Sequence, residues 1–287
     1  MYDNLGRTGS AAMNDSTVDA VTALIAEAAQ TLILPRFRNL RPEDIEDKSP
    51  TLDRQDLVTA VDRDVELWLA HAFERLEPGA AVIGEEAVFA RPDLLSLIET
   101  DQPLWIIDPI DGTKNFARGD DGFGVMVARV VAGQTTAAWL TLPARGDMFV
   151  AVAGAGTCLN GARVHVPLAP GAECLRGSMF VRHMPSELRN RVMASATQQC
   201  DVVTDSSCAA VEYTDVVRGR RDFAVYYRLL PWDHAAPALI LSEAGGCVDH
   251  QSGARYSVRS ANLVTVVARS AEVSARVRER LGGEQAS

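Results

Sequence analysis

The chain has 287 residues, of which 47% are hydrophobic and 23% charged, and its 38 acidic and 28 basic residues give a net charge of −10. This composition is typical of a globular protein with one large domain or two closely packed ones, and it argues against a disordered or fibrous chain. The acidic excess disfavours binding to nucleic-acid polymers and to anionic membranes.

The spacing of the cysteines and histidines also limits the kinds of site that the protein could contain. The five cysteines form no CxxC pair, and the five histidines form no cluster with zinc-ligand spacing. No apolar run reaches the roughly 18 residues of a membrane-spanning helix, and the start of the chain does not resemble a secretory segment. The expectation is a cytoplasmic protein with reduced thiols.

The first half of the chain begins with two amphipathic helices. Apolar residues recur at helical spacing from Ser16, which predicts a helix capped by Ser16 or Thr17. A second helix is predicted from about Asp56 to Pro78-Gly79. Strands are predicted next, with hairpin turns among the later ones, at 81–83, 104–107, 124–131, 135–142 and 148–152.

Strands and helices alternate in the second half, which predicts a mixed or parallel sheet covered on both faces. The expected strands are 178–181, 202–204, 223–227 and 262–267, and the expected helices are 185–196, 209–217, 233–244 and 271–281. We therefore predict an α+β domain over 16–154 and an α/β domain over 155–281, with a flexible leader (1–15) and a flexible tail (282–287).

Acidic residues follow two of the predicted strands. Gly84-Glu85-Glu86 follows the first, and Asp108-Pro109-Ile110-Asp111-Gly112-Thr113 follows Trp105-Ile106-Ile107. Strand ends are where a rigid scaffold presents reactive groups, so these carboxylates are expected to converge. Each motif taken alone also fits a solvated acidic pair or a capped turn.

A helix starting near Gly112 would point the backbone N–H groups of Gly112, Thr113 and Lys114 outward and form a phosphate-sized anion site. Several carboxylates beside such a site repel one another unless a cation is present, and ligand sets made only of oxygen select hard ions. The sequence thus favours Mg²⁺, with Mn²⁺ as a substitute, in a reaction that hydrolyses a phosphoester.

Four segments in order resemble the inositol monophosphatase family from about residue 48 to residue 267. They are Asp56-Leu57-Val58-Thr59-Ala60-Val61-Asp62, Ile83-Gly84-Glu85-Glu86, Trp105 to Phe116, and Pro231-Trp232-Asp233-His234-Ala235-Ala236 with Glu243-Ala244-Gly245-Gly246. The resemblance implies a layered αβαβα sandwich of the sugar phosphatase fold. It also implies a homodimer and two to three Mg²⁺ ions where the two halves meet.

The same resemblance assigns the metal ligands. It implies that Glu85, Asp108 and the carbonyl of Ile110 hold the first ion, and that Asp108, Asp111 and Asp233 hold the second. Asp62 and Glu86 would bound a third position, so the first domain carries most of the ligands and the second supplies Asp233. Without the resemblance, Asp233 and Thr113 are more simply interpreted as helix caps.

The implied chemistry is direct hydrolysis of a small soluble phosphomonoester. Thr113 and Glu85, with Asp62 nearby, would orient and deprotonate the attacking water, and the N–H groups of Gly112 and Thr113 would hold the phosphate. No phosphorylated enzyme intermediate is expected.

The substrate-selecting segments depart from the family pattern. Cys208 and Ala209 occupy the place of a Gly-Thr-Ala-Ala segment, and Tyr226 and Arg228 lie where the family carries an inositol-binding Glu. Cys208 is expected not to hydrogen-bond as Thr would. Arg228 is expected either to pair with a second phosphate or to be an exposed loop charge.

An inositol monophosphate-like substrate therefore competes with 3′-phosphoadenosine 5′-phosphate, fructose 1,6-bisphosphate and histidinol phosphate. A different class, a phosphate-sensing or scaffolding relative without catalysis, would be indicated by a missing metal carboxylate, and none is missing. Trp105 and Trp232 are predicted to pack in the core, and His234 is predicted to lie at the surface.

Overall fold

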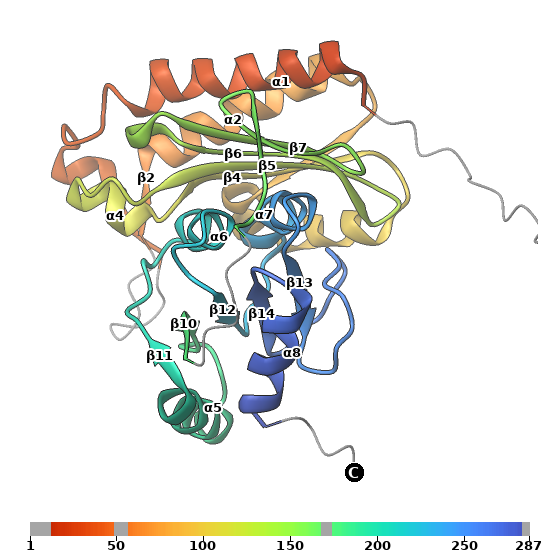
Figure 1. Ribbon diagram of the computed structural model, residues 1–287. Helices are drawn as coiled ribbons and strands as arrows, with labels where there is room; N and C mark the ends of the chain where they lie inside the picture. Colours follow the sequence, from red (N-terminus) through yellow and green to blue (C-terminus); the bar gives the residue numbers. More distant parts are fainter. Residues whose placement is uncertain (1–12, 49–56, 168–173, 283–287) are drawn as a thin grey trace, which may run out of the picture.

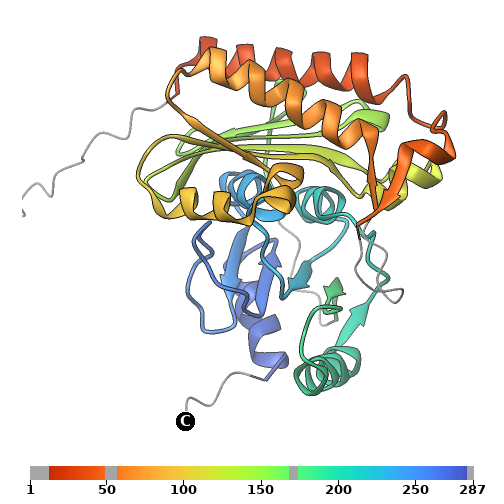
Figure 2. The same cartoon turned by 180° about the vertical axis from the view of Figure 1, so that it is seen from behind.

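The protein, seen in a computed structural model that describes residues 13–48, 57–167 and 174–282, is built from five layers. Helices α1 and α2 lie on one face of a large sheet (Figure 1). Helices α6 and α7 lie between this sheet and a smaller one, and α5 and α8 cover the far side of the smaller sheet, as the opposite view also shows (Figure 2). The predicted αβαβα sandwich is confirmed.

The elements up to Val164 contain the large sheet and its outer helices. They are α1 (Asp15–Ala28), a π-helical turn (Ala29–Ile33), a 3₁₀ turn (Pro42–Asp44), β1 (Ile45–Asp47), β2 (Leu57–Thr59), α2 (Ala60–Leu76), β3 (Ala81–Gly84), α3 (Glu85–Ala90), a 3₁₀ helix (Pro92–Glu99), β4 (Leu104–Asp111), α4 (Thr113–Arg118), β5 (Gly124–Val131), β6 (Gln134–Leu142), a 3₁₀ turn (Pro143–Arg145), β7 (Asp147–Val152), β8 (Gly156–Leu159) and β9 (Ala162–Val164).

The later elements form the smaller sheet and the remaining helices. They are β10 (Leu175–Phe180), α5 (Ser186–Gln199), β11 (Cys200–Val202), α6 (Ala209–Val217), β12 (Phe223–Tyr226), α7 (Pro231–Glu243), β13 (Cys247–His250), β14 (Thr265–Ala268) and α8 (Ala271–Arg280). In the described residues no helix is long and apolar enough to cross a membrane.

The two sheets differ in strand direction. The seven-stranded sheet has the order β3-β4-β5-β6-β7-β8-β9 and is antiparallel except for the parallel pair β3 and β4. The five-stranded sheet has the order β11-β10-β12-β14-β13, in which β10 is parallel to both of its neighbours. Strands β8 and β9 extend the first sheet to Val164, so the domain boundary predicted after residue 154 falls inside that sheet.

Three apolar clusters separate the layers. One joins α1 and α2 to the outer face of the large sheet through Ile25, Leu69 and Trp105. The second joins α6 and α7 to the facing surfaces of both sheets, and the third joins α5 and α8 to the small sheet. Because α6 and α7 bury side chains against both sheets, the two halves are packed into one body. Trp105 and Trp232 are buried, as predicted.

Both N-terminal helices start differently from the prediction. Asn14 caps α1 by accepting from the Thr17 N–H at 2.8 Å, so the helix begins before Ser16, within the predicted leader. Helix α2 begins at Ala60 because Thr59 is extended and shares a capping box with Asp62. Most of the predicted leader, the predicted helix start at Asp56 and most of the predicted tail lie outside the described residues.

Candidate functional site

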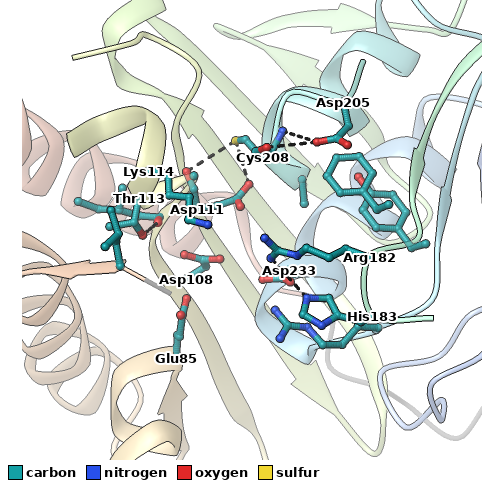
Figure 3. A pocket seen from close by; sticks show the side chains of 18 of the residues that line it. Glu85, Asp108, Asp111, Thr113, Lys114, Arg182, His183, Asp205, Cys208 and Asp233 are labelled. Atoms are coloured by element: carbon teal, nitrogen blue, oxygen red, sulfur yellow. Dashed lines mark hydrogen bonds between the residues drawn. The ribbon is translucent and has the colours of Figure 1, made fainter. Parts of the chain in front are cut away.

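The acidic residues converge because two parallel strands end side by side. Gly84 of β3 pairs with Ile107 of β4, so the next residues, Glu85 and Asp108, emerge together at one sheet edge. The β4 register shifts between Asp108 and Asp111. These three carboxylates and Asp233 from α7 line a cavity of about 280 Å³ (Figure 3). The convergence predicted from sequence is present.

Asp108 lines this cavity, and the residue is 1% exposed. No N–H or hydroxyl group of the described residues donates to its Oδ1 or Oδ2. Burial, followed by the negative charges of Glu85, Asp111 and Asp233, raises its pKa well above the usual range. A buried carboxylate in this setting is costly unless a cation or a proton neutralises it.

Asp111 is held in place by the start of α6. Its Oδ2 accepts from the Ala210 N–H at 2.5 Å and from the Cys208 thiol at 3.0 Å. The Cys208 thiol thus donates to a carboxylate of the site, and the expectation that it does not bind a substrate hydroxyl as Thr would stays a prediction. Cys208 and Ala209 line the cavity, although both are buried.

Thr113 and Asp62 form a hydrogen-bonded pair beside the cavity. The Thr113 hydroxyl lies 3.1 Å from Asp62 Oδ1 and 2.9 Å from the carbonyl oxygen of Ile110. Asp62 Oδ2 accepts from the Thr59 N–H at 2.9 Å and from the Thr59 hydroxyl at 2.5 Å. Burial raises the pKa of Asp62 to about 7. Asp62 therefore caps α2 and also faces Thr113.

Helix α4 begins where the sequence predicted. Gly112 precedes it with φ of 82°, and the helix runs from Thr113, so the first-turn N–H groups open on the cavity that both residues line. A Cβ at Gly112 would lie 2.9 Å from the carbonyl oxygen of Gly122. Both the backbone angle and the close approach thus require glycine here.

Lys48, which no sequence motif indicated, pairs with two predicted metal ligands. Its Nζ lies 3.1 Å from Glu85 and 2.7 Å from Glu86, and its side chain is 5% exposed. Glu86 does not line the cavity, whereas Glu85 does. The lysine thus supplies positive charge at the acidic edge.

Glu66 of α2 was also missed. Its two carboxylate oxygens accept from the N–H groups of Glu86 and Ala87, each at 2.8 Å. This fixes the first turn of α3, which carries Glu85. Glu66 follows Asp62 by four residues, which places both residues on the same face of α2. Nothing in the sequence indicates that this face meets the end of β3.

Asp233 is not the cap of α7. Leu230 occupies the N-cap position and Asp233 lies in the first turn, which leaves its carboxylate available to the cavity. Burial, then the charges of Asp111 and Glu85, raises its pKa well above the usual range, and Arg228 opposes the shift. The capping interpretation of Asp233 is wrong.

The neighbouring His234 is buried, contrary to the prediction that it lies at the surface. It is 1% exposed; its Nδ1 lies 2.9 Å from the Tyr213 hydroxyl and its Nε2 lies 3.2 Å from the Arg228 carbonyl oxygen. Because a carbonyl only accepts, Nε2 carries the proton and Nδ1 accepts from Tyr213. Burial lowers the pKa of His234 to about 4.

The opposite wall of the cavity contains the predicted residues Tyr226 and Arg228. It also contains Phe180, Arg182 and His183, which no motif indicated. Figure 3 shows Arg182 and His183 across the cavity from Glu85, Asp108 and Thr113. The cavity therefore has an acidic side and a basic side.

The donor set fits a hard divalent cation. Carboxylate oxygens and the Ile110 carbonyl are the ligand types that Mg²⁺ prefers, and the unpartnered Asp108 needs a positive charge. Within the residues the structure describes, no three acidic, histidine or cysteine side chains already form a closed metal site. Binding would require these carboxylates to draw together around the ion.

Comparison with known proteins agrees with this geometry. A model of the inositol monophosphatase family matches residues 14–281. The chain is 31% identical to a fructose-1,6-bisphosphatase/inositol-1-monophosphatase of Thermotoga maritima over 73% of its length and 77% of the relative's. It is 30% identical to the Nus factor SuhB of Pseudomonas aeruginosa over 83% of its length and 87% of the relative's.

Solved structures show the same fold. An IMPase of Thermotoga maritima superposes with a TM-score of 0.74 at 26% identity, covering 93% of this chain and 100% of that one. An inositol monophosphatase of Anabaena superposes with a TM-score of 0.73 at 20% identity, covering 93% of this chain and 94% of that one.

Proposed function

Because the chain belongs to the inositol monophosphatase family, we propose that it is a Mg²⁺-dependent phosphatase of a small soluble phosphomonoester. The observation that carries the proposal is the buried, unpartnered carboxylate of Asp108 among other acids at the ends of two parallel strands. A structural carboxylate is expected to have hydrogen-bond donors, as Glu66 does. A carboxylate without donors suits a cation.

Glu85, Asp108 and the Ile110 carbonyl would hold one Mg²⁺, and Asp108, Asp111 and Asp233 a second. Asp62 and Glu86 would bound a third position, and Mn²⁺ could substitute. When bound, the ions would neutralise the phosphate and lower the pKa of the attacking water. Lys48 would have to release Glu85 and Glu86 as the ions enter.

The chain's own groups would orient the reactants. The Thr113 hydroxyl lies 3.1 Å from Asp62 Oδ1, so it would pass its own proton to that oxygen while its oxygen takes a proton from the attacking water. Asp62, with its pKa raised to about 7, is suited to take up a proton near neutral pH. We therefore propose that Thr113 relays the proton of the water to Asp62, and that Glu85 helps to orient this water. The N–H groups of Gly112 and Thr113 would hold phosphate oxygens.

A second candidate function is a scaffold without catalysis, since one group of relatives is named Nus factor SuhB. Every predicted metal carboxylate is present in this chain, and Asp108, Asp111 and Asp233 face a common cavity. A pure scaffold has no need for buried, mutually repelling carboxylates, because they reduce stability. The site thus favours the enzyme.

The test is phosphate release from inositol 1-phosphate, 3′-phosphoadenosine 5′-phosphate, fructose 1,6-bisphosphate and histidinol phosphate, with Mg²⁺ and with chelator. Release from at least one substrate that requires Mg²⁺ is expected. Folded protein that binds Mg²⁺ by calorimetry but releases no phosphate from a broad set of phosphomonoesters would contradict the proposal and favour the scaffold.

A further inference from the structure

The basic side of the cavity is formed by two arginines at equivalent positions on neighbouring strands. Strands β10 and β12 are parallel and pair in register, with Phe180 opposite Tyr226 at their ends. Arg182 lies two residues beyond Phe180, and Arg228 lies two residues beyond Tyr226. Since the carboxyl ends of parallel strands meet at one sheet edge, both arginines emerge beside the same cavity, which both line.

Neither arginine is in an ion pair with an acidic side chain, although Arg228 is near enough to Asp233 to oppose the rise of its pKa. Among the ion pairs of the residues that the structure describes, none includes Arg182 or Arg228. Arg182 Nη2 lies 3.4 Å from His183 Nε2, which is a weak contact with a group that carries no negative charge. The acidic Asp205 also lines the cavity, where its Oδ1 accepts from the Ser207 N–H at 2.9 Å.

Several other arginines of the same half pair with acids. Arg221 pairs with Glu212 at 3.1 Å, Arg269 with Asp222 at 3.0 Å and Arg218 with Asp147 at 2.7 Å. In a chain with ten more acidic than basic residues, 38 against 28, carboxylate partners are abundant. Arg189 and Arg191 of α5 are in no ion pair among the described residues either, but they do not line the cavity. Two guanidinium groups on one cavity wall, neither of them in an ion pair, suit an anion that comes from outside the chain.

The backbone of Arg228 is also held in place. The buried His234 donates from Nε2 to the Arg228 carbonyl and is itself oriented by the Tyr213 hydroxyl. Between the two arginine-bearing strand ends, Phe180 and Tyr226 stack with ring centroids 4.5 Å apart, and both line the cavity. A stacked pair of rings is a rigid support that positions the charged groups beyond it.

We propose that the substrate carries a second phosphate group, bound by Arg182 and Arg228 on the side of the cavity opposite the reacting phosphate. The proposal rests on the proposed phosphatase function and narrows its substrate to small bisphosphates. The planar guanidinium fork matches phosphate oxygens, whereas a neutral polyol such as inositol offers these two charges no partner. His234 acts as a positioning residue for Arg228.

The experiment compares substrates that differ only in the second phosphate. One pair is fructose 1,6-bisphosphate and fructose 1-phosphate, and the other is 3′-phosphoadenosine 5′-phosphate and adenosine 3′-phosphate. The kcat/KM ratio of bisphosphate to monophosphate is measured with Mg²⁺ for the unaltered protein and for Arg182→Met, Arg228→Met and Arg191→Met. Arg191 is the matched control, since it is exposed on α5 and does not line the cavity.

A ratio well above one is expected for at least one pair. The pair that shows it also identifies whether a sugar or a nucleoside carries the phosphates. Each cavity substitution should lower this ratio roughly 10- to 100-fold, the scale of one lost charged hydrogen bond, mainly through KM. Arg191→Met should leave it unchanged. Arg182→Lys and Arg228→Lys should retain part of the preference, because the charge remains.

Three outcomes are separable. Hydrolysis with a ratio near or below one for both pairs would overturn the second-phosphate proposal and leave the phosphatase function standing. An unchanged ratio in both methionine variants would overturn the assignment of these arginines. If nothing is hydrolysed, thermal stabilisation by each ligand with Mg²⁺ still tests binding, and equal shifts for bisphosphate and monophosphate would contradict the proposal.

Discussion

Asp108 and Glu66 are both buried carboxylates, and their surroundings separate a reactive group from a supporting one. Asp108 has no donor on either oxygen, whereas each oxygen of Glu66 accepts from a backbone N–H at 2.8 Å. The hydrogen bonds of Glu66 offset part of the cost of its burial, and Asp108 lacks such compensation. The difference predicts different effects of the same isosteric substitution at the two positions.

Asp108→Asn should lower kcat by roughly 100- to 1000-fold or more, because the charge that would bind both cations is lost. The same change removes repulsion with Glu85, Asp111 and Asp233, so the melting temperature in chelator should stay equal or rise. Kinetics and thermal melts check both parts. Full activity in this variant would contradict the proposed site.

Glu66→Gln should weaken the support of α3, because an amide has only one acceptor atom for the N–H groups of Glu86 and Ala87. We expect a loss of about 1–3 kcal/mol in the free energy of unfolding and a roughly 10- to 100-fold weaker Mg²⁺ half-saturation. Glu74→Gln, an exposed change on the same helix, is the control. Equal behaviour of the two variants would show that Glu66 positions nothing.

At the scale of elements, the junction between β4 and α4 brings together the acids proposed to bind metal, the N–H groups proposed to hold the phosphate, and the start of α6. Strand β4 carries Asp108 and Asp111, the left-handed Gly112 turns the chain, and α4 begins at once with Thr113. The start of α6 then closes on this junction through Cys208 and Ala210. A distortion at Gly112 should therefore disturb several site groups together.

Gly112→Ala would place a Cβ 2.9 Å from the Gly122 carbonyl oxygen and 3.1 Å from the Cys208 Cβ, at a φ of 82°. We expect a loss of about 2–4 kcal/mol in unfolding free energy, with reduced activity. Gly146→Ala is a matched control, because its φ is 67° and nothing lies within 4 Å, so only a backbone cost of about 1 kcal/mol is expected. Denaturant unfolding distinguishes the two.

At the scale of the whole molecule, the site lies where the two sheets face each other across α6 and α7 (Figure 1). The large sheet supplies the acidic side and the small sheet the basic side. Packing of α6 and α7 against both sheets holds these two sides in a fixed relation. Acids gathered at this junction also make the stability of the whole fold depend on pH and on cations.

The pKa values of Asp62 and Glu66, each raised to about 7 mainly by burial, set the sign of this dependence. A folded-state pKa above the unfolded value gives stability at low pH that is lost as pH rises through the folded pKa. His234 gives the opposite trend only below its ordinary value of 6.5. Between about pH 6.5 and 8, the change of stability with pH therefore reports on the carboxylates and not on His234.

In chelator, the melting temperature should fall between pH 6.5 and 8, and saturating Mg²⁺ should reduce or abolish the fall. Asp108→Asn in chelator should show a shallower fall, because one repelling charge is gone. A melting temperature that rises with pH in chelator over this interval would contradict the assignment of raised pKa values to these acids.

Several parts of the site could be predicted from the sequence because they depend on local order. Strands β3 and β4 end beside the predicted acids, and these acids converge as predicted, although the parallel pairing that brings them together was not predicted. The errors have a common origin in contacts that are distant in sequence. His234 at the surface was reasonable from the local pattern alone, but its contacts with Tyr213 and with the Arg228 carbonyl hold it in the interior. The capping interpretation of Asp233, which the family resemblance had already replaced, fails because Leu230 occupies the cap position.

The sequence by itself determined the family, the layered fold, the order of its elements and the acidic residues that converge, since strand and helix patterns and motif spacing are local properties. Only the tertiary structure decided that Glu66 supports α3, that Lys48 pairs with Glu85 and Glu86, and that Arg182 stands beside Arg228. These relations depend on which strands become neighbours. Strand pairing is fixed by the packing of the whole chain, and no residue pattern in β10 or α2 encodes it.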